Sequence, residues 1–256
     1  MSLNQNELFE LLETKYKQYN QPEFIETDPI QIPNLFTKKQ DIEIAGFFAA
    51  TLAWGQRTTI LKNANQLMSW MDHAPYDFIL NFENYDLRIF ENFKHRTFNG
   101  EDCISFLKAF QYIYRNFESL ENAFFPSDSN HNIPENISNF KKLFFSLPHQ
   151  NRTEKHIADP MKSSAAKRIN MFLRWMVRQD EHGVDFGIWK AVKPAELFCP
   201  LDTHSGNVAR KLGLLNRWQD DWKSVEELTT QLRKFDKNDP VKYDFALFGL
   251  GVFEKF

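Results

Sequence analysis

Apolar residues recur at spacings of three and four along most of the chain, and stretches in which apolar and polar residues alternate are scarce. The first spacing is typical of amphipathic α-helices, whereas alternation is typical of half-buried strands. The pattern therefore predicts an all-α protein. The expected helices are Leu3–Tyr19, Lys39–Ala53, Arg57–Asp72, Ala74–Asn81, Glu101–Asn116, Ile137–Ser146, Ser164–Arg178, His204–Leu212, Ser224–Lys234 and Pro240–Leu250.

Glycine, proline and clustered polar residues mark where several of these helices begin or end. Gly213 stands at the C′ position of the helix that starts at His204, and Asp239 precedes Pro240 as an N-cap followed by proline at N1. Residues 126–136, PSDSNHNIPEN, have no apolar periodicity and many turn formers, which predicts a long polar loop. We interpret residues 1–256 as one all-α domain in two lobes, with a groove between them.

The composition and the first residues indicate in which compartment the chain is expected to act. The first residues carry neither a basic opening nor an apolar core, so no export signal is visible, and the longest uncharged apolar run, Ile44 to Gly55, is too short for a membrane helix. The two cysteines, Cys103 and Cys199, lie far apart and exclude a CxxC motif or a four-cysteine iron–sulfur cluster within the chain. We expect a cytoplasmic monomer without a membrane partner, an iron–sulfur cluster or another cofactor.

Positive charge is concentrated locally although the net charge is −3. Residues 151–178 hold seven Lys or Arg against two acidic residues, and residues 205–217 hold three against none. Such segments are either solvated helix faces or a surface for nucleic acid, and the charge count alone leaves both open.

The first basic segment contains SSAAKRINMFLRWMV, residues 163–177. Drawn as a helix, it gathers its apolar residues on one broad face and places Lys167, Arg174 and Arg178 on the opposite side. We interpret these three residues as a cationic stripe that Lys167 begins. Taken alone, Lys167 is either a solvated surface lysine or a functional one.

The second segment is CPLDTHSGNVARKLGL, residues 199–214. Asp202 directly precedes a helical pattern, so we expect it to be an N-cap that accepts hydrogen bonds from the backbone N–H groups of His204 and Ser205. A carboxylate in this position stays ionised. An ionised carboxylate beside a lysine is suited to a reaction in which positive charge develops, such as a sugar losing its base.

Both segments resemble motifs of one family. LDTHSGNVARKLGL is similar to the VDTH-x-x-R-V-x-x-R-L segment of the helix-hairpin-helix DNA glycosylase superfamily, which includes endonuclease III and the 8-oxoguanine glycosylases. SSAAKRINMF resembles its hairpin G-V-G-x-K-x-A and the helix that follows. The resemblance implies that Asp202 is the essential carboxylate, in a segment of about residues 199–214. It also implies that Lys167 is the Schiff-base nucleophile, in a helix-hairpin-helix segment of about residues 153–178.

Two further segments extend the resemblance. IAGFFAATLAWGQRTTILKNANQLM, residues 44–68, resembles the family's apolar helix, in which Gln56 takes the place of the glutamine that probes DNA and Thr58 the place of a threonine. DPVKYDFALFGLG resembles the closing helix that packs under the aspartate. In the hairpin, Ser163 and Ala165 replace the family's two glycines, so side chains are expected to contact phosphate there. The DNA-binding residues implied by the resemblance are Gln56, Arg57, Thr58, Ser163, Ser164, Arg168, Arg174 and His204. Three tryptophans are expected either to line a base pocket or to lie in the core: Trp54, Trp175 and Trp189.

The resemblance implies a base-excision repair glycosylase that acts on duplex DNA carrying a damaged base such as 8-oxoguanine. The base would be taken out of the stack, Lys167 would attack C1′ as a neutral amine, and Asp202 would stabilise the cationic sugar. The Schiff base would then permit strand cleavage, and no metal is expected, since His204 and Cys199 beside Asp202 are too few ligands. Three alternatives remain: an N-glycosidic hydrolase of modified nucleosides or nucleotides, a non-catalytic nucleic-acid-binding module, and a structural helical protein.

Overall fold

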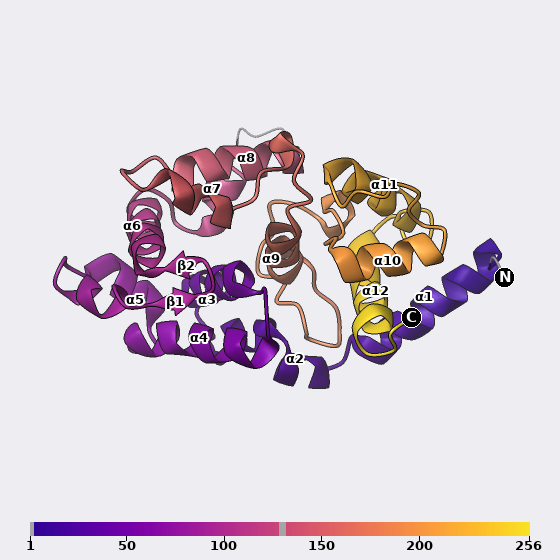
Figure 1. Ribbon diagram of the computed structural model, residues 1–256, viewed down its shortest axis with the longest axis horizontal. Coiled ribbons are helices and arrows are strands. Elements are labelled where there is room, and N and C mark those ends of the chain that lie inside the picture. Colours follow the sequence, from indigo (N-terminus) through magenta and orange to yellow (C-terminus); the bar gives the residue numbers. More distant parts are fainter. Residues whose placement is uncertain (1–2, 128–131) are drawn as a thin grey trace. The chain divides into compact units, whose positions relative to one another are not determined.

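The computed structural model describes residues 3–127 and 132–256. In these residues the secondary structure is almost entirely helical, with one short hairpin of two strands, so the prediction of an all-α protein is confirmed (Figure 1). The chain forms two compact units. We call residues 1–24 and 159–256 the terminal unit and residues 25–158 the central unit.

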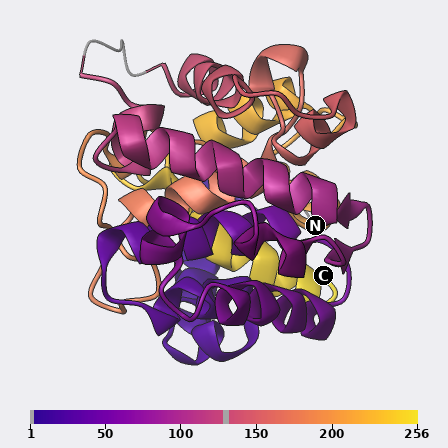
Figure 2. The ribbon, with the colours of Figure 1, turned by 90° about the vertical axis from the view of Figure 1, so that its left-hand side faces the viewer.

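The central unit is built around α3 (Lys39–Leu52), in which every residue from Ile42 to Leu52 is buried. Phenylalanine rings fill the space around this helix. The ring of Phe47, for example, contacts those of Phe106, Phe110, Phe140 and Phe144. In Figure 2, which faces this unit, the long helix α6 crosses the front in magenta. The other elements are α4 (Arg57–Trp70), α5 (Pro75–Asn81), β1 (Lys94–His95), β2 (Phe98–Asn99), α6 (Gly100–Asn116), α7 (Leu120–Phe124) and α8 (Ile133–Phe144), while α2 (Glu23–Thr27) spans the boundary between the units.

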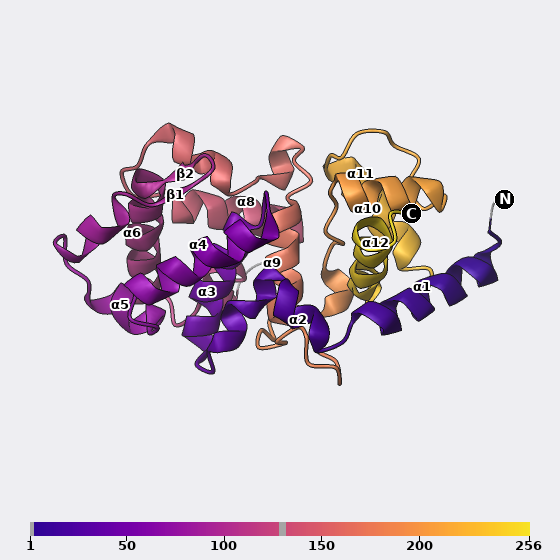
Figure 3. The same cartoon turned by 60° about the horizontal axis from the view of Figure 1, so that its bottom comes forward.

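The terminal unit joins the two ends of the sequence. Its helices are α1 (Gln5–Tyr19), α9 (Lys167–Val177), α10 (Thr203–Lys211), α11 (Trp222–Leu232) and α12 (Tyr243–Val252). α12 packs against both α1 and α10, and Figure 3 shows it beside them. The last helix of the chain thus packs against the helix that directly follows Asp202.

Two glycines let α12 approach its neighbours closely. A Cβ atom at Gly249 would lie 2.0 Å from the ring of Tyr19 in α1, and one at Gly251 would lie 3.2 Å from Val208 in α10. Real Cβ atoms do not approach a ring as closely as the first of these distances, because atoms in protein interiors are already close-packed. The α1–α12 contact therefore requires glycine at position 249.

The helix predictions from apolar spacing are confirmed, because each of the ten predicted ranges holds a helix. The predicted C′ glycine is also confirmed: Gly213 has a φ of +74°, its N–H donates to Arg210 O at 3.1 Å, and the N–H of Leu214 donates to Ala209 O at 2.8 Å. This pair of hydrogen bonds is the Schellman motif, which ends α10. The pattern does not predict the short helices α2 and α7.

Two boundaries differ from prediction. Of the polar loop expected over residues 126–136, residues 128–131 lie outside the described residues, and α8 already begins at Ile133 because its proline stands in the first turn, where no N–H is required. Asp239 does not cap a helix through its side chain; that carboxylate instead accepts a hydrogen bond from Arg178 Nε at 2.8 Å. No helix in the described parts of the chain is both long and apolar enough to cross a membrane.

Candidate active site

Asp202 is the N-cap of α10, as predicted. Its backbone is extended, and its Oδ1 atom accepts hydrogen bonds from the N–H groups of His204 at 2.9 Å and Ser205 at 3.0 Å. The Ser205 hydroxyl returns the contact by accepting a hydrogen bond from the Asp202 N–H at 3.0 Å, which completes a capping box. One carboxylate oxygen is thus used to begin the helix, while the other remains available.

Lys167 faces that second oxygen. Its Nζ atom lies 3.4 Å from Asp202 Oδ2, and the two side chains are 26% and 31% exposed. The distance is longer than a typical charge-assisted hydrogen bond, so the ammonium group is near the carboxylate without being clamped to it. The structure therefore brings together the two residues proposed as the chemical pair, at a place that a solute can reach.

Electrostatics keep Asp202 ionised. Burial raises the pKa of its carboxyl group, but the Lys167 ammonium and the N–H groups of His204 and Ser205 outweigh this effect and hold the pKa below its ordinary value. The positive end of the α10 dipole acts in the same direction. Asp202 is consequently an anion at neutral pH, as a group that stabilises a developing cation must be.

The turn that leads into α9 is strained. Ser163 and Ala166 both have positive φ values, 64° and 47°, in the left-handed region that non-glycine residues rarely adopt. Ala166 is the N-cap of α9 but offers no side-chain hydrogen bond, and Lys167 places a cation at the N-terminal end of the helix dipole, where it is unfavourable. Proteins tolerate such departures from local preference mainly at functional sites.

At position 163, where the resemblance implies a glycine, the backbone is left-handed. The second glycine that the resemblance implies falls on Ala165, whereas the second left-handed residue is Ala166. Before the turn the described chain forms two 3₁₀ segments, Asn151–His156 and Pro160–Lys162, rather than an α-helix. Ser163 is exposed and Ser164 is half-buried, so both side chains are accessible at the turn.

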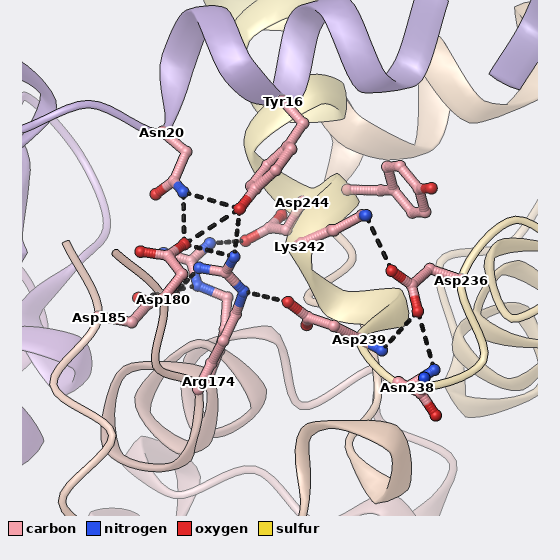
Figure 4. A network of polar contacts seen from close by, with 12 residues as sticks. Tyr16, Asn20, Arg174, Asp180, Asp185, Asp236, Asn238, Asp239, Lys242 and Asp244 are labelled. Atoms are coloured by element: carbon pink, nitrogen blue, oxygen red, sulfur yellow. Dashed lines mark hydrogen bonds and ion pairs between the residues drawn. The ribbon is translucent and has the colours of Figure 1, made fainter. Parts of the chain in front are cut away.

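The predicted cationic stripe on α9 is wrong. Arg174 and Arg178 are 3% and 0% exposed, and both form ion pairs with aspartates inside the terminal unit (Figure 4). Arg174 contacts Asp185 and Asp244, so its guanidinium holds elements together and is not free to contact DNA as expected. The pairs of Arg178 are with Asp180, Asp185 and Asp239.

Asp244 is an electrostatic neighbour of the Lys167–Asp202 pair that was not predicted from the sequence. It lies on α12, is 7% exposed, and forms its ion pair with Arg174. Burial raises the pKa of Asp244 to about 6, against the opposing effects of the Arg174 and Lys167 cations, while the Asp202 carboxylate raises it further. Asp244 is therefore electrostatically coupled to both members of the pair. An aspartate within the apolar run YDFALFGLG is the signal that could have revealed it.

The remaining expected DNA contacts divide between the units. In the terminal unit His204 is exposed on the first turn of α10, while Arg168 is half-buried in the first turn of α9 and burial lowers its pKa to about 10. In the central unit Gln56, Arg57 and Thr58 form the start of α4, where Gln56 and Thr58 are exposed and Arg57 is half-buried.

The tryptophans proposed for a base pocket have different environments. Trp175 and Trp189 are completely buried, so both belong to the core of the terminal unit and neither presents a face to a base. Trp54, in the central unit, is half-buried, with the Arg96 guanidinium 4.8 Å from its ring centroid and the His95 ring edge-on at 6.0 Å. Of the three, only Trp54 keeps part of its surface exposed.

The second basic segment is largely neutralised within the fold. Arg210 pairs with Asp220 at 2.7 Å, and Arg217 pairs with Asp221 at 2.5 Å. Cys199 is buried, which raises the pKa of its thiol, and residues 3–127 and 132–256 contain no cluster of three or more His, Cys, Asp or Glu residues suited to a metal ion. A hollow of about 470 Å³ in this unit adjoins residues 210–214, at the opposite end of α10 from Asp202.

Comparison with known proteins gives one result. A family described as "Protein of unknown function (DUF2400)" matches residues 28–253, which is most of the chain. Neither the curated proteins nor the solved structures gave a match.

Proposed function

We propose that this chain, which belongs to the DUF2400 family, is a DNA glycosylase in which Lys167 and Asp202 act together. One observation carries the proposal: Lys167 Nζ lies 3.4 Å from Asp202 Oδ2, while the other oxygen of the same carboxylate is fixed by the N-terminus of α10. The substrate that we propose is duplex DNA with a damaged base such as 8-oxoguanine.

The reaction begins with the transfer of a proton from the Lys167 ammonium to water, which leaves a neutral amine beside the ionised Asp202. The amine attacks C1′ of the damaged nucleotide, the C1′–N bond breaks, and its electron pair leaves with the base, which takes up a proton. Asp202 stabilises the positive charge that develops on the sugar. Rearrangement gives a Schiff base between Lys167 and C1′. Loss of a C2′ proton then expels the 3′ phosphate and cleaves the strand.

Covalent trapping tests this mechanism directly. The purified chain is incubated with borohydride and with duplexes carrying 8-oxoguanine, uracil or an abasic site. We expect a covalent complex that disappears in Lys167→Gln. The exposed Lys162, five residues earlier, provides the matched control, because Lys162→Gln removes a nearby amine and should still be trapped.

Base release from the same duplexes separates the two activities. Base release without a covalent complex would support a glycosylase and reject the Schiff-base step. No complex and no released base on any duplex would overturn the proposal. Hydrolysis of a modified nucleoside by the same protein, abolished in Asp202→Asn, would then assign an N-glycosidic hydrolase instead.

A further inference from the structure

Trp218 is the most exposed large hydrophobic side chain that the structure describes. Its exposed fraction is 89%, compared with 72% for Tyr85, the next in order. It lies in the loop between α10 and α11, and its sequence neighbours from Asn216 to Asp220 are polar. An indole that is almost fully in water contributes little to the core, so its presence here calls for another explanation.

The loop that carries Trp218 is held in one conformation. Arg210 donates from Nε to Arg217 O at 2.7 Å and from Nη2 to Trp218 O at 3.0 Å, and it also pairs with Asp220. The Ser224 hydroxyl donates to the next carbonyl, that of Gln219. Three consecutive carbonyl groups are thus fixed, and the exposed indole is presented on a preorganised backbone, which lowers the entropic cost of binding a ligand.

The end of this loop and the first residue of α11 contact both elements that carry the chemical pair. On the side of the strained turn, the Trp222 N–H donates to Ser163 O at 3.2 Å, and Asp221 forms a β-bridge with Ser164. On the side of α10, a Cβ atom at Gly206 would lie 2.8 Å from Asp220 Oδ1. Because Trp218 is three residues from Asp221, its Cα lies within about 11 Å of the Cα of Asp221, the residue that forms the β-bridge with Ser164.

We propose that Trp218 is a stacking platform for an unpaired nucleobase, on the loop that contacts the turn before Lys167, an inference that rests on the proposed function. A protein interface requires a cluster of apolar residues that buries about 800 Å² on each partner, whereas the sequence neighbours of Trp218 on both sides are polar. A single exposed indole fits one base, which it can bind through its π-face irrespective of sequence.

The charges of the loop are compatible with a nucleic acid. Its two aspartates, Asp220 and Asp221, are each paired with an arginine, so the loop presents no unpaired carboxylate of its own to the phosphate backbone. Lys223, which follows the loop, is exposed. A base unstacked by extrusion of its neighbour would therefore meet an aromatic face in a neutral setting.

Binding measurements that do not require catalysis test the inference. The Lys167→Gln protein is titrated by fluorescence anisotropy with a fully paired duplex and with a duplex that carries one bulged base. Trp218→Ala in this background should weaken binding to the bulged duplex about tenfold and leave the fully paired duplex unaffected. Trp218→Phe should retain most of the affinity, since it keeps a ring. Tyr85→Ala, which removes an exposed aromatic from the central unit, is the matched control and should change neither affinity.

Equal affinity of the Trp218→Ala and parent proteins for the bulged duplex would overturn the inference, as would absence of nucleic-acid binding. A change in molar mass by light scattering on Trp218→Ala would show that Trp218 contacts a second copy instead. The proposed function can fail independently of this inference. Bulge-specific binding that depends on Trp218, without covalent trapping or base release, would support the stacking platform and reject the glycosylase. Covalent trapping together with unchanged binding of Trp218→Ala would support the glycosylase and reject the stacking platform.

Discussion

Lys167 begins α9 and Asp202 caps α10, and their side chains meet 3.4 Å apart where both helices have their N-termini. The dipole of an N-terminus stabilises a carboxylate, so this arrangement favours the charge of Asp202. The pair thus places the Lys167 amino group beside a firmly held anion, which is the combination that a nucleophile and its stabilising carboxylate require.

Replacing Asp202 separates its two roles. Asparagine is as good an N-cap as aspartate, so Asp202→Asn should change the free energy of unfolding by less than about 1 kcal/mol. Base release should nevertheless fall on the order of 10²-fold, because the charge that stabilises the sugar is gone. Asp202→Ala should lose both the activity and about 1 kcal/mol of stability. Urea denaturation and base-release rates measure the two effects, and an active Asp202→Asn protein would contradict the assignment.

The strain at the turn predicts a stabilising substitution. Ser163 is exposed and has a φ of 64°, so Ser163→Gly should relieve backbone strain and raise the free energy of unfolding by about 1 kcal/mol. Ala165→Gly is the control, because Ala165 does not have a positive φ and glycine there adds only chain entropy to the unfolded state. Thermal unfolding of both variants measures the difference. Equal changes in the unfolding temperature of the two variants, in the same direction, would mean that the turn is not strained at Ser163.

The buried Asp244 predicts a specific pH dependence. Its pKa in the folded chain is about 6, above the ordinary value of 3.8 that applies to the unfolded chain. The folded state therefore takes up this proton first, and protonation of Asp244 stabilises the fold as the pH falls from about 7 to about 4. Asp244→Asn lacks this titration.

Urea midpoints of the wild type and of Asp244→Asn, measured from pH 7 to pH 4, provide the comparison. The difference in the free energy of unfolding should move in favour of the wild type as the pH falls. A difference that stays constant, or that moves in the opposite direction, would show that the Asp244 carboxyl is not destabilised by burial.

Close packing of α12 predicts unequal effects of two similar substitutions. Gly249→Ala would place a methyl group within 2.0 Å of the Tyr19 ring and should cost about 1–3 kcal/mol or more, because α1 must move. Gly251→Ala meets Val208 at 3.2 Å, which a small shift can absorb, and should cost much less. Chemical denaturation of the two variants tests this order. A Gly251→Ala protein less stable than Gly249→Ala would reverse the packing argument.

Local features were predictable from the sequence. The helices follow from apolar spacing, and both the cap at Asp202 and the Schellman end at Gly213 depend on residues within one helical turn. These interactions involve neighbours in the sequence, so the local pattern contains the information that specifies them.

Long-range polar pairing was not predictable in the same way. Arg174 and Arg178 fall on the polar side of α9 in the sequence pattern, yet both are buried, because aspartates from later segments meet them inside the unit. A pattern of apolar and polar positions treats an arginine as exposed whether or not a partner arrives from elsewhere in the chain. The same limitation concealed Asp244 as a neighbour of the Lys167–Asp202 pair.

The discontinuous terminal unit has a consequence for synthesis on the ribosome. Of the described helices α1 leaves the ribosome first, but its principal partner α12 is translated more than 200 residues later. The central unit, which is continuous in sequence, can fold while α1 still has no partner, since domains generally fold as units as they emerge. The α1 segment must therefore avoid aggregation until α12 has been translated. Its surface is predominantly polar, and only Leu8 and Leu12 are buried in the folded state, so the segment exposes little apolar area while it has no partner.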